Sequence, residues 1–276
     1  MNLQDFVTAR YEQIAANLGH PDLTQDTFQT LEALSTDEVN KPALLAWLSD
    51  GLQKNDRRWE IRTALRCLAQ IIQPRSYLEI GTRRGWSMAQ VLSVAPRVNV
   101  YSVDMWIKNY GDVTNPGPEF VRAEMKRAAP DFVGNISFLN GNSHHLLPIF
   151  LDDIIPQQNG VDYTELIRQA ENRPHQFDLV TVDGDHTALG AWWDLLDVMP
   201  HVALGGAVVF DDLLDRSDEL FGDQPTSPFA NRYPPLTNFK PSLKDVWLRI
   251  KRIFGNFAYI ENYDGQPPIG VAIRMR

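Results

Sequence analysis

The sequence predicts an α/β fold built on a mostly parallel sheet with helices on both faces. Short apolar runs ending in Gly, Asp or Asn recur from residue 76 onward, and helix-like stretches separate most of them. Such runs of Val, Ile, Leu and Phe are typical of strands that are buried on both faces. The length of 276 residues suits one large domain, or a domain with appendages, because single cores stop growing near about 250 to 300 residues.

Helices are expected before the sheet begins. Apolar residues recur at three-to-four spacing through residues 1–73, for example at Ile61, Leu65 and Leu68, which is the period of an amphipathic helix. We therefore expect residues 1–73 to form an N-terminal helical cap and residues 74–276 to form the main domain.

Seven strands are expected in the main domain. Their sequences, in chain order, are YLEIG, VNVYSVD, ISFLNG, FDLVTVDGD, GAVVFDD, NFAYIENY and IGVAIRMR. The last two flank a DGQPP turn and predict an antiparallel hairpin, which follows a helix around Leu243 to Ile253. The Pro-rich stretch 213–241 predicts an irregular lid or substrate loop, or else a passive linker.

Composition and charge exclude several classes of function. Lys and Arg total 26 against 35 Asp and Glu, for a net charge of −9, and such a surface repels phosphate backbones and anionic membranes. No apolar run approaches the roughly 18 to 20 residues of a membrane span. The only cysteine is Cys67, and the first residues lack the basic and apolar regions of a signal peptide. We expect a cytoplasmic protein that binds neither nucleic acid nor membranes, with Cys67 as a buried, inert thiol.

A glycine turn follows the first strand. Gly81 and Gly85 permit a tight turn and let a ligand approach backbone N–H groups where a helix begins. Asp104 ends the second strand, 23 residues after Gly81, where a carboxylate in this architecture accepts hydrogen bonds from ribose hydroxyls. The spacing differs from the G-x-G-x-x-G of dinucleotide sites. Glu79, just before the turn, would repel a pyrophosphate but suits a cationic ligand.

Three carboxylates follow two further strands. Asp183 ends the fourth strand, and Asp211 and Asp212 end the fifth, so all three are expected in the crevice at the carboxyl ends of the strands. Crowded carboxylates raise one another's pKa, and a hard divalent cation with oxygen ligands, here expected to be Mg²⁺, neutralises their charge. Asp185 is either a further ligand or, as we favour, a solvated turn residue.

These motifs together resemble those of class I S-adenosylmethionine-dependent methyltransferases: E-x-G-x-x-x-G after the first strand, an acid after the second, and a final antiparallel hairpin. The resemblance spans about residues 76–276 and implies a Rossmann-like, mostly parallel seven-stranded sheet. It also implies that the glycine turn holds the methionine part of the cofactor, that Asp104 holds the ribose, and that residues after the third strand lie near the adenine. The implied cofactor-binding residues are Glu79, Gly81, Gly85, Ser87, Asp104, Asn142, Ser143 and Asp183.

The acidic strand ends also resemble a narrower group. Asp211 and Asp212 follow Asp183 by 28 and 29 residues, similar to the metal-ligand spacing of catechol and macrolide-sugar O-methyltransferases. FDLVTVDGDHT followed by GGAVVFDDL looks like the macrolide-sugar enzymes and their cephalosporin-biosynthesis relatives. The resemblance implies Asp183, Asp211 and Asp212 as metal ligands and His186 as the general base. His144, together with His145, is interpreted as the polar start of a helix outside the site.

The leading hypothesis is an S-adenosylmethionine-dependent and Mg²⁺-dependent O-methyltransferase. It would act on a hydroxyl of a small-molecule acceptor, namely a sugar, diol or catechol-like natural product. Methyl transfer is an in-line displacement, and Mg²⁺ on two vicinal oxygens would both orient the acceptor and lower its hydroxyl pKa. Three alternatives stay open: a metal-independent small-molecule methyltransferase, an NAD(P)-dependent oxidoreductase and a non-catalytic cofactor-binding module. Helical caps often pack between protomers, so a homo-oligomer is also expected.

Overall fold

The N-terminal part of the chain is helical, as the sequence predicts. The computed structural model describes residues 2–35, 40–110, 113–155, 162–214, 226–236, 241–264 and 267–276. The first four helices are α1 (Leu3–Asn17), α2 (Pro21–Ala33), α3 (Lys41–Lys54) and α4 (Ile61–Ile72). Helix α4 begins where Glu60 and Thr63 form a capping box, which satisfies backbone N–H groups that have no partner within the helix.

Seven strands form the main sheet. They are β1 (Ser76–Ile80), β2 (Asn99–Asp104), β5 (Ile136–Asn140), β6 (Phe177–Val182), β7 (Val202–Phe210), β8 (Phe257–Asn262) and β9 (Ile269–Arg274). Their order across the sheet is β5-β2-β1-β6-β7-β9-β8. The first five run parallel, whereas β9 is antiparallel to both β7 and β8. The predicted Rossmann-like sheet with a C-terminal antiparallel hairpin is confirmed.

The carboxyl ends of four parallel strands lie level at one edge of the sheet. Ile80 of β1 pairs with Val103 of β2 and with Val182 of β6, which in turn pairs with Phe210 of β7. The chain leaves β1 toward β2 on one side and later enters β6 on the other, so the strand order reverses between β1 and β6. Open α/β sheets bind ligands at such a switch point. The residues that follow these strand ends are Gly81, Asp104, Asp183 and Asp211.

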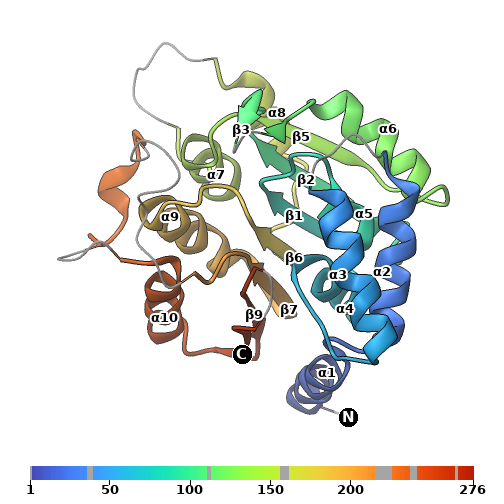
Figure 1. The fold of residues 1–276 in the computed structure, drawn as a ribbon. Coiled ribbons are helices and arrows are strands. Elements are labelled where there is room, and N and C mark those ends of the chain that lie inside the picture. Colours follow the sequence, from blue (N-terminus) through green and yellow to red (C-terminus); the bar gives the residue numbers. More distant parts are fainter. Residues whose placement is uncertain are drawn as a thin grey trace.

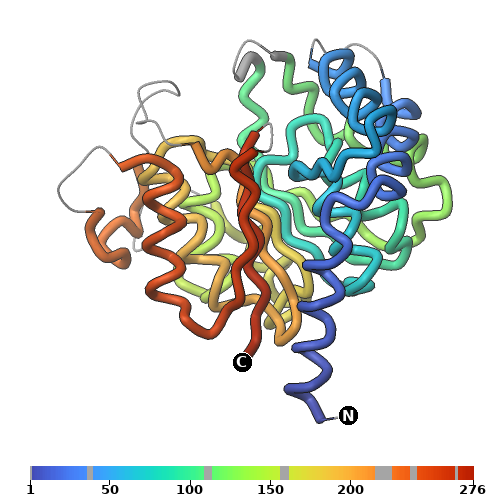
Figure 2. Tube along the Cα trace, turned by 60° about the horizontal axis from the view of Figure 1, so that its bottom comes forward, coloured from blue at the N-terminus to red at the C-terminus, as the bar shows by residue number. Residues whose placement is uncertain are grey.

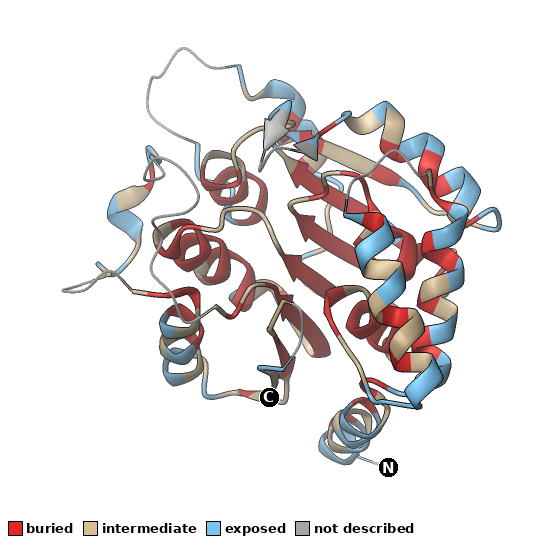
Figure 3. Cartoon of the chain, viewed as in Figure 1, coloured by how far each residue is buried: buried red, intermediate tan, exposed pale blue. Residues whose placement is uncertain are grey.

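Helices cover both faces of the sheet (Figure 1). One face carries α4, α5 (Trp86–Leu92) and α6 (Pro118–Ala128), with α2 over them and α3 beside α2. The other face carries α7 (Ser143–Asp152), α8 (Thr164–Ala170), α9 (Ala188–Val198) and α10 (Leu243–Ile253). The strands and the inward helix faces are buried, and the outer helix faces are exposed (Figure 3).

The N-terminal helices share a hydrophobic core with the sheet. Leu31 of α2 and Leu65 of α4 belong to the same buried cluster as Leu179 of β6 and Val209 of β7. Helix α1, blue in Figure 2, lies at the same end of the molecule as the carboxyl terminus. Whether residues 1–73 act as a separate cap stays a prediction.

Some details of the structure extend the sequence prediction. A short antiparallel hairpin follows β2; its strands, β3 (Asn109–Tyr110) and β4 (Val113–Thr114), have two residues each. The Pro-rich stretch is described at 213–214, 226–236 and 241, and its remaining residues lie outside the described part of the chain, as do Gly265 and Gln266 of the DGQPP turn. Within the described ranges, no helix is long and apolar enough to cross a membrane.

Candidate active site at the carboxyl ends of the parallel strands

The glycine turn after β1 lies directly against the end of β6. Gly81 has a φ of +87°, and a Cβ atom there would lie 1.9 Å from the carbonyl oxygen of Asp183. Gly85, with a φ of +78°, precedes the first residue of α5. Only glycine combines this backbone conformation with so close an approach. The turn therefore brings the predicted cofactor loop beside the predicted metal carboxylate.

Glu79 and Ser87 form a buried pair behind the turn. Oε1 of Glu79 accepts hydrogen bonds from the Tyr77 hydroxyl, at 2.9 Å, and from the Ser87 hydroxyl, at 2.5 Å. Its Oε2 is buried and has no hydrogen-bond partner among the described residues. Burial raises the pKa of Glu79 to about 7, against these hydrogen bonds, which lower it. Glu79 thus lies where a positively charged ligand would favour its ionised form.

Backbone N–H groups of two different segments hold the side chain of Asp104 at the end of β2. Oδ2 accepts from the backbone N–H of Arg83 in the glycine turn, at 2.7 Å, and Oδ1 accepts from that of Trp106, at 2.6 Å. The Asn115 side chain donates a third bond to Oδ1, at 3.1 Å. Each carboxylate oxygen has two lone pairs, and the half-buried side chain keeps acceptor capacity for a ligand. The orientation of Asp104 is therefore set by three donors, one of which belongs to the glycine turn.

The predicted adenine residues lie at the start of α7. Asn142 is the N-cap of this helix, and its Oδ1 accepts from the backbone N–H of His144 at 2.9 Å. Ser143, the first residue of the helix, is buried. Both residues follow β5, so they border the site from that side of the sheet.

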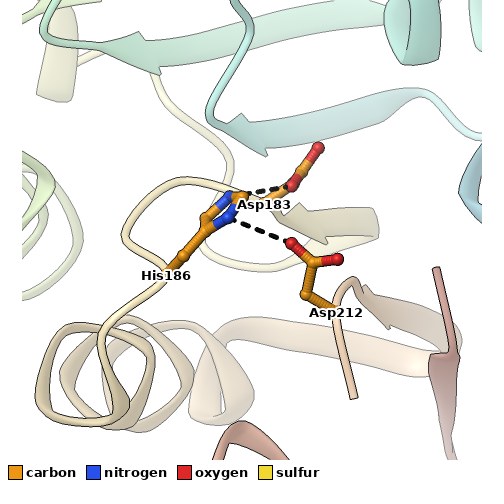
Figure 4. A group of neighbouring side chains, drawn as sticks. All are labelled: Asp183, His186 and Asp212. Atoms are coloured by element: carbon orange, nitrogen blue, oxygen red, sulfur yellow. Dashed lines mark ion pairs between the residues drawn. The ribbon is translucent and has the colours of Figure 1, made fainter. Parts of the chain in front are cut away.

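Three potential metal ligands converge beside the glycine turn. Asp183 follows β6, Asp212 follows β7 and His186 lies on the turn before α9 (Figure 4). One ligand atom from each lies within 4.8 Å of the others. Nε2 of His186 lies 3.4 Å from Oδ1 of Asp183, and its Nδ1 lies 3.0 Å from Oδ2 of Asp212. The imidazole ring is therefore located between the two carboxylates.

The charges of this group stabilise one another. Burial alone would lower the pKa of His186, but hydrogen bonds with Asp183 and Asp212 and their charges raise it well above 6.5. Burial raises the pKa of Asp183, and the imidazolium of His186 opposes that shift. In this arrangement the two carboxylates favour the protonated form of the His186 ring.

Asp211 lies in the same pocket but outside the converging group. Its side chain is buried, and its Oδ1 has no hydrogen-bond partner among the described residues. Burial, and then the charges of Asp183 and Asp212, raise its pKa well above 3.8. The pocket lining is completed by Val182, Gly184, Asp185, Phe210 and Leu243. Among the predicted metal carboxylates, the structure brings Asp183 and Asp212 together with His186, whereas Asp211 stands apart.

Arg62 is a site residue that the sequence analysis missed. It lies in the first turn of α4, and its Nη1 donates to Oε2 of Glu60 at 2.5 Å. Its guanidinium lies over the ring of Trp86, 5.4 Å from the centroid, and its charge opposes the raised pKa values of Asp183 and Asp211. Nothing in the local sequence signals this role, because only the packing of α4 on the sheet brings Arg62 to the strand ends.

His144 also differs from the expectation. Its side chain is only 1% exposed, with Nε2 3.0 Å from Oδ2 of Asp185 and Nδ1 3.2 Å from Oδ1 of Asp194. His144 does lie in the polar first turn of α7, as predicted, but this turn faces α9 rather than solvent. Asp185, in turn, is not simply solvated but is paired with this histidine.

Residues 78–213 match the family model described as a methyltransferase domain. No curated protein matches the chain. Similar solved structures include the O-methyltransferase TomG from Streptomyces achromogenes, at 15% identity over 76% of this chain and 77% of that chain, with a TM-score of 0.45. Two others are the O-methyltransferase from Bacillus cereus, at 14% identity, 76% and 78% coverage and a TM-score of 0.44, and PaMTH1 from Podospora anserina, at 10% identity, 92% and 88% coverage and a TM-score of 0.47.

The sheet topology and the family match agree on the class of protein. Residues 78–213 extend from β1 to just beyond β7 and contain the glycine turn, Asp104, Asp183 and Asp212. They match a methyltransferase domain, in agreement with the predicted resemblance to class I methyltransferases.

Proposed function

We propose that this chain transfers the methyl group of S-adenosylmethionine to a hydroxyl oxygen of a small molecule, with Mg²⁺ bound by Asp183 and Asp212. The observation that carries the proposal is the convergence of these two carboxylates with His186 within 4.8 Å, at the same sheet edge as the glycine turn. Oxygen ligands of this kind suit Mg²⁺. The acceptor is a sugar, diol or catechol-like natural product, a class supported by the resemblance of the FDLVTVDGDHT and GGAVVFDDL stretches to natural-product O-methyltransferases.

The cofactor is proposed to lie along the glycine turn. Its methionine part lies against the Gly81–Gly85 backbone, near the acidic Glu79 and Asp183, and its ribose hydroxyls donate to Asp104. The cofactor also carries a carboxylate, and Arg62 supplies a positive charge on this side of the pocket. The positive and negative groups of the cofactor thus each face protein side chains of the opposite charge.

The adenine is proposed to lie near the start of α7, where Asn142 caps the helix and Ser143 begins it. Ser87, which donates to Glu79, supports the turn from behind rather than through its own contact with the ligand. This arrangement assigns each predicted cofactor residue either to a surface of the ligand or to the support of the turn.

Mg²⁺ and the side chains around it are proposed to handle the acceptor and its proton. Mg²⁺ at this site would orient the acceptor and lower the pKa of its hydroxyl. Asp211 is proposed as a further ligand, because its unpartnered oxygen belongs to the same pocket. When Asp183 and Asp212 bind a cation, they no longer hold the proton on His186, so the pKa of His186 falls and its neutral ring can accept the proton of the acceptor.

Metal-independent transfer is a second candidate, and the position of His186 favours it. Protonated His186 already places a positive charge between Asp183 and Asp212, so the two carboxylates have a partner without a metal. In that case the deprotonated form of His186, oriented by Asp212, would be the base. The two candidates differ in whether a cation binds here.

We also propose that the protein acts in the cytoplasm as a homo-oligomer and does not bind nucleic acid. The net charge of −9 supports the last point, since an acidic surface repels phosphate backbones. The single buried cysteine suits a reducing compartment.

The test is calorimetric titration of S-adenosylmethionine and Mg²⁺, separately and together, into three proteins. These are the wild type, Asp212→Asn and the control Asp131→Asn, which changes an exposed carboxylate before β5. We expect all three proteins to bind S-adenosylmethionine, and Asp212→Asn alone to lose Mg²⁺ binding. Diol acceptors are then screened for methylation with and without Mg²⁺.

Two results would overturn parts of the proposal. If the cofactor binds but Mg²⁺ binds none of the proteins, even with acceptors present, the metal role is refuted and His186→Gln tests the metal-independent candidate. If the wild type does not bind S-adenosylmethionine, the proposed reaction itself is refuted.

A further inference from the structure

A buried chain of charged side chains lies behind the candidate metal site. Asp194 of α9 is fully buried, and His144 of α7 is 1% exposed. The ring of His144 bridges Asp194, 3.2 Å from its Nδ1, and Asp185, 3.0 Å from its Nε2. A buried charge is stable only when it is paired. Here one histidine is the charged partner of two carboxylates.

Asp185 connects this histidine to the site. It lies between Asp183 and His186 in the chain, on the turn that carries both. Its Oδ1 accepts from the backbone N–H of Thr187 at 2.8 Å. A Cβ atom at Gly190 would lie within 2.2 Å of the Asp185 carboxylate, so this carboxylate rests directly on the backbone of α9. The contact with His144 thus fixes the turn between the two site residues.

The same histidine also contacts residues 226–236, here called the proline segment. The Ser227 hydroxyl donates to the backbone carbonyl of His144 at 2.6 Å. The ring of His144 meets the edge of Trp193, with centroids 5.3 Å apart. Trp193 stacks on Tyr233 of the proline segment, at 5.4 Å and 22°. Contacts of His144 therefore extend from the proline segment to the site turn.

The proline segment has further anchors that bypass His144. The Tyr233 hydroxyl donates to Oδ2 of Asp197 at 2.8 Å, and the Trp192 indole donates to the carbonyl of Pro234 at 3.0 Å. Nε2 of His145 lies 3.0 Å from the carbonyl oxygen of Thr226. His145 touches the segment without touching the site turn, and so provides a matched control for its neighbour.

We propose that His144 is a positioning residue that couples the proline segment to the turn carrying Asp183 and His186. The roles of Asp183 and His186 in this inference rest on the proposed function. The contacts that couple the proline segment to the turn are features of the fold and do not depend on it. Without His144, Asp194 and Asp185 lose their shared partner. Asp185, with a side chain 25% exposed, can then turn toward solvent and draw the site turn with it. The charges favour a protonated ring, because Asp194 and Asp185 raise the pKa of His144 to about 10 against its burial.

The test compares His144→Gln with His145→Gln in the full chain. The first readout is amide hydrogen exchange, which needs neither metal nor cofactor. In His144→Gln we expect faster exchange both at Thr187, whose N–H donates to Asp185, and across the proline segment. In His145→Gln we expect a change within the proline segment alone. Unchanged exchange at Thr187 in folded His144→Gln would refute the coupling.

The second readout is the affinity for Mg²⁺ and for S-adenosylmethionine, each titrated alone. Residues that orient metal ligands typically change metal affinity by about 10- to 100-fold, and we expect a loss of this size for Mg²⁺ in His144→Gln. Cofactor affinity should fall less than Mg²⁺ affinity, because among the described residues the ring of His144 contacts the cofactor side only through the Ser143 hydroxyl, at 3.5 Å from its Nδ1. Equal losses of both affinities would indicate a general structural role and overturn the proposal.

The test still decides the proposal if the wild type binds no Mg²⁺ or if His144→Gln does not fold. If wild-type protein binds no Mg²⁺, the metal part of the proposed function fails, and hydrogen exchange still decides the coupling. If His144→Gln does not fold, Asp185→Asn replaces it, because this change removes the charge of the partner on the turn and leaves the buried histidine paired with Asp194. Because Asp185 itself accepts from the N–H of Thr187, the readout for this variant is exchange across the proline segment, which should become faster; an unchanged rate there would count against the proposal.

Discussion

Replacing Gly81 by alanine tests the close approach that builds the cofactor turn. The φ of +87° costs a residue with a Cβ about 1 to 3 kcal/mol. The new Cβ would also lie 1.9 Å from the carbonyl oxygen of Asp183. This contact is with backbone and cannot be relieved by a side-chain rotation, so β1 and β6 must separate locally, at a further cost of about 1 to 3 kcal/mol. We expect Gly81→Ala to lower the free energy of unfolding by about 2 to 6 kcal/mol.

The matched control is Gly117→Ala. Gly117 has a similar φ of +92°, but a Cβ there would meet nothing within 4 Å, so only the backbone cost of about 1 to 3 kcal/mol remains. Urea unfolding gives both free energies, and calorimetry gives the affinity for S-adenosylmethionine. We expect Gly81→Ala to be the less stable variant and to bind the cofactor more weakly, while Gly117→Ala retains its affinity. Equal stabilities together with equal affinities would refute the argument from close approach.

Three further predictions follow from buried polar groups. Burial raises the pKa of Glu79 from 4.5 to about 7, so its contribution to stability is present below pH 4.5 and is lost as the pH rises through 7, by about 3 kcal/mol. Glu79→Gln removes this loss, and a stability difference from wild type that stays constant between pH 5 and 8 would contradict it. Burial raises the pKa of Cys67 to about 12, so iodoacetamide at pH 8 should leave the folded protein unmodified and label it in urea; labelling at equal rates would disprove the assignment. Nη1 of Arg66 donates to Thr30 of α2 and to Gln90 of α5, both at 3.0 Å, so Arg66→Met should lower the free energy of unfolding by about 1 to 3 kcal/mol, whereas the exposed Arg97→Met should leave it unchanged.

Much of the site follows from local sequence patterns. A buried apolar run that ends in glycine or aspartate marks the end of a strand, and parallel strands present their carboxyl ends at one edge. These two rules are enough to assign Gly81, Asp104 and Asp183 to one crevice. The helix from Leu243 to Ile253 has the bounds that the sequence predicts, because Ser242 and Asp245 form a capping box ahead of its apolar face.

The tertiary structure decided what local patterns leave open. Neighbouring residues such as Asp211 and Asp212 diverge according to the backbone after the strand, and Asp212, with a φ of +57°, turns toward His186 while Asp211 stays buried apart. Arg62 and His144 reach the site from helices distant in sequence. Hydrophobic periodicity determines which face of a helix is buried, but only the packing of helix on sheet determines which charged side chain lies beside which strand end.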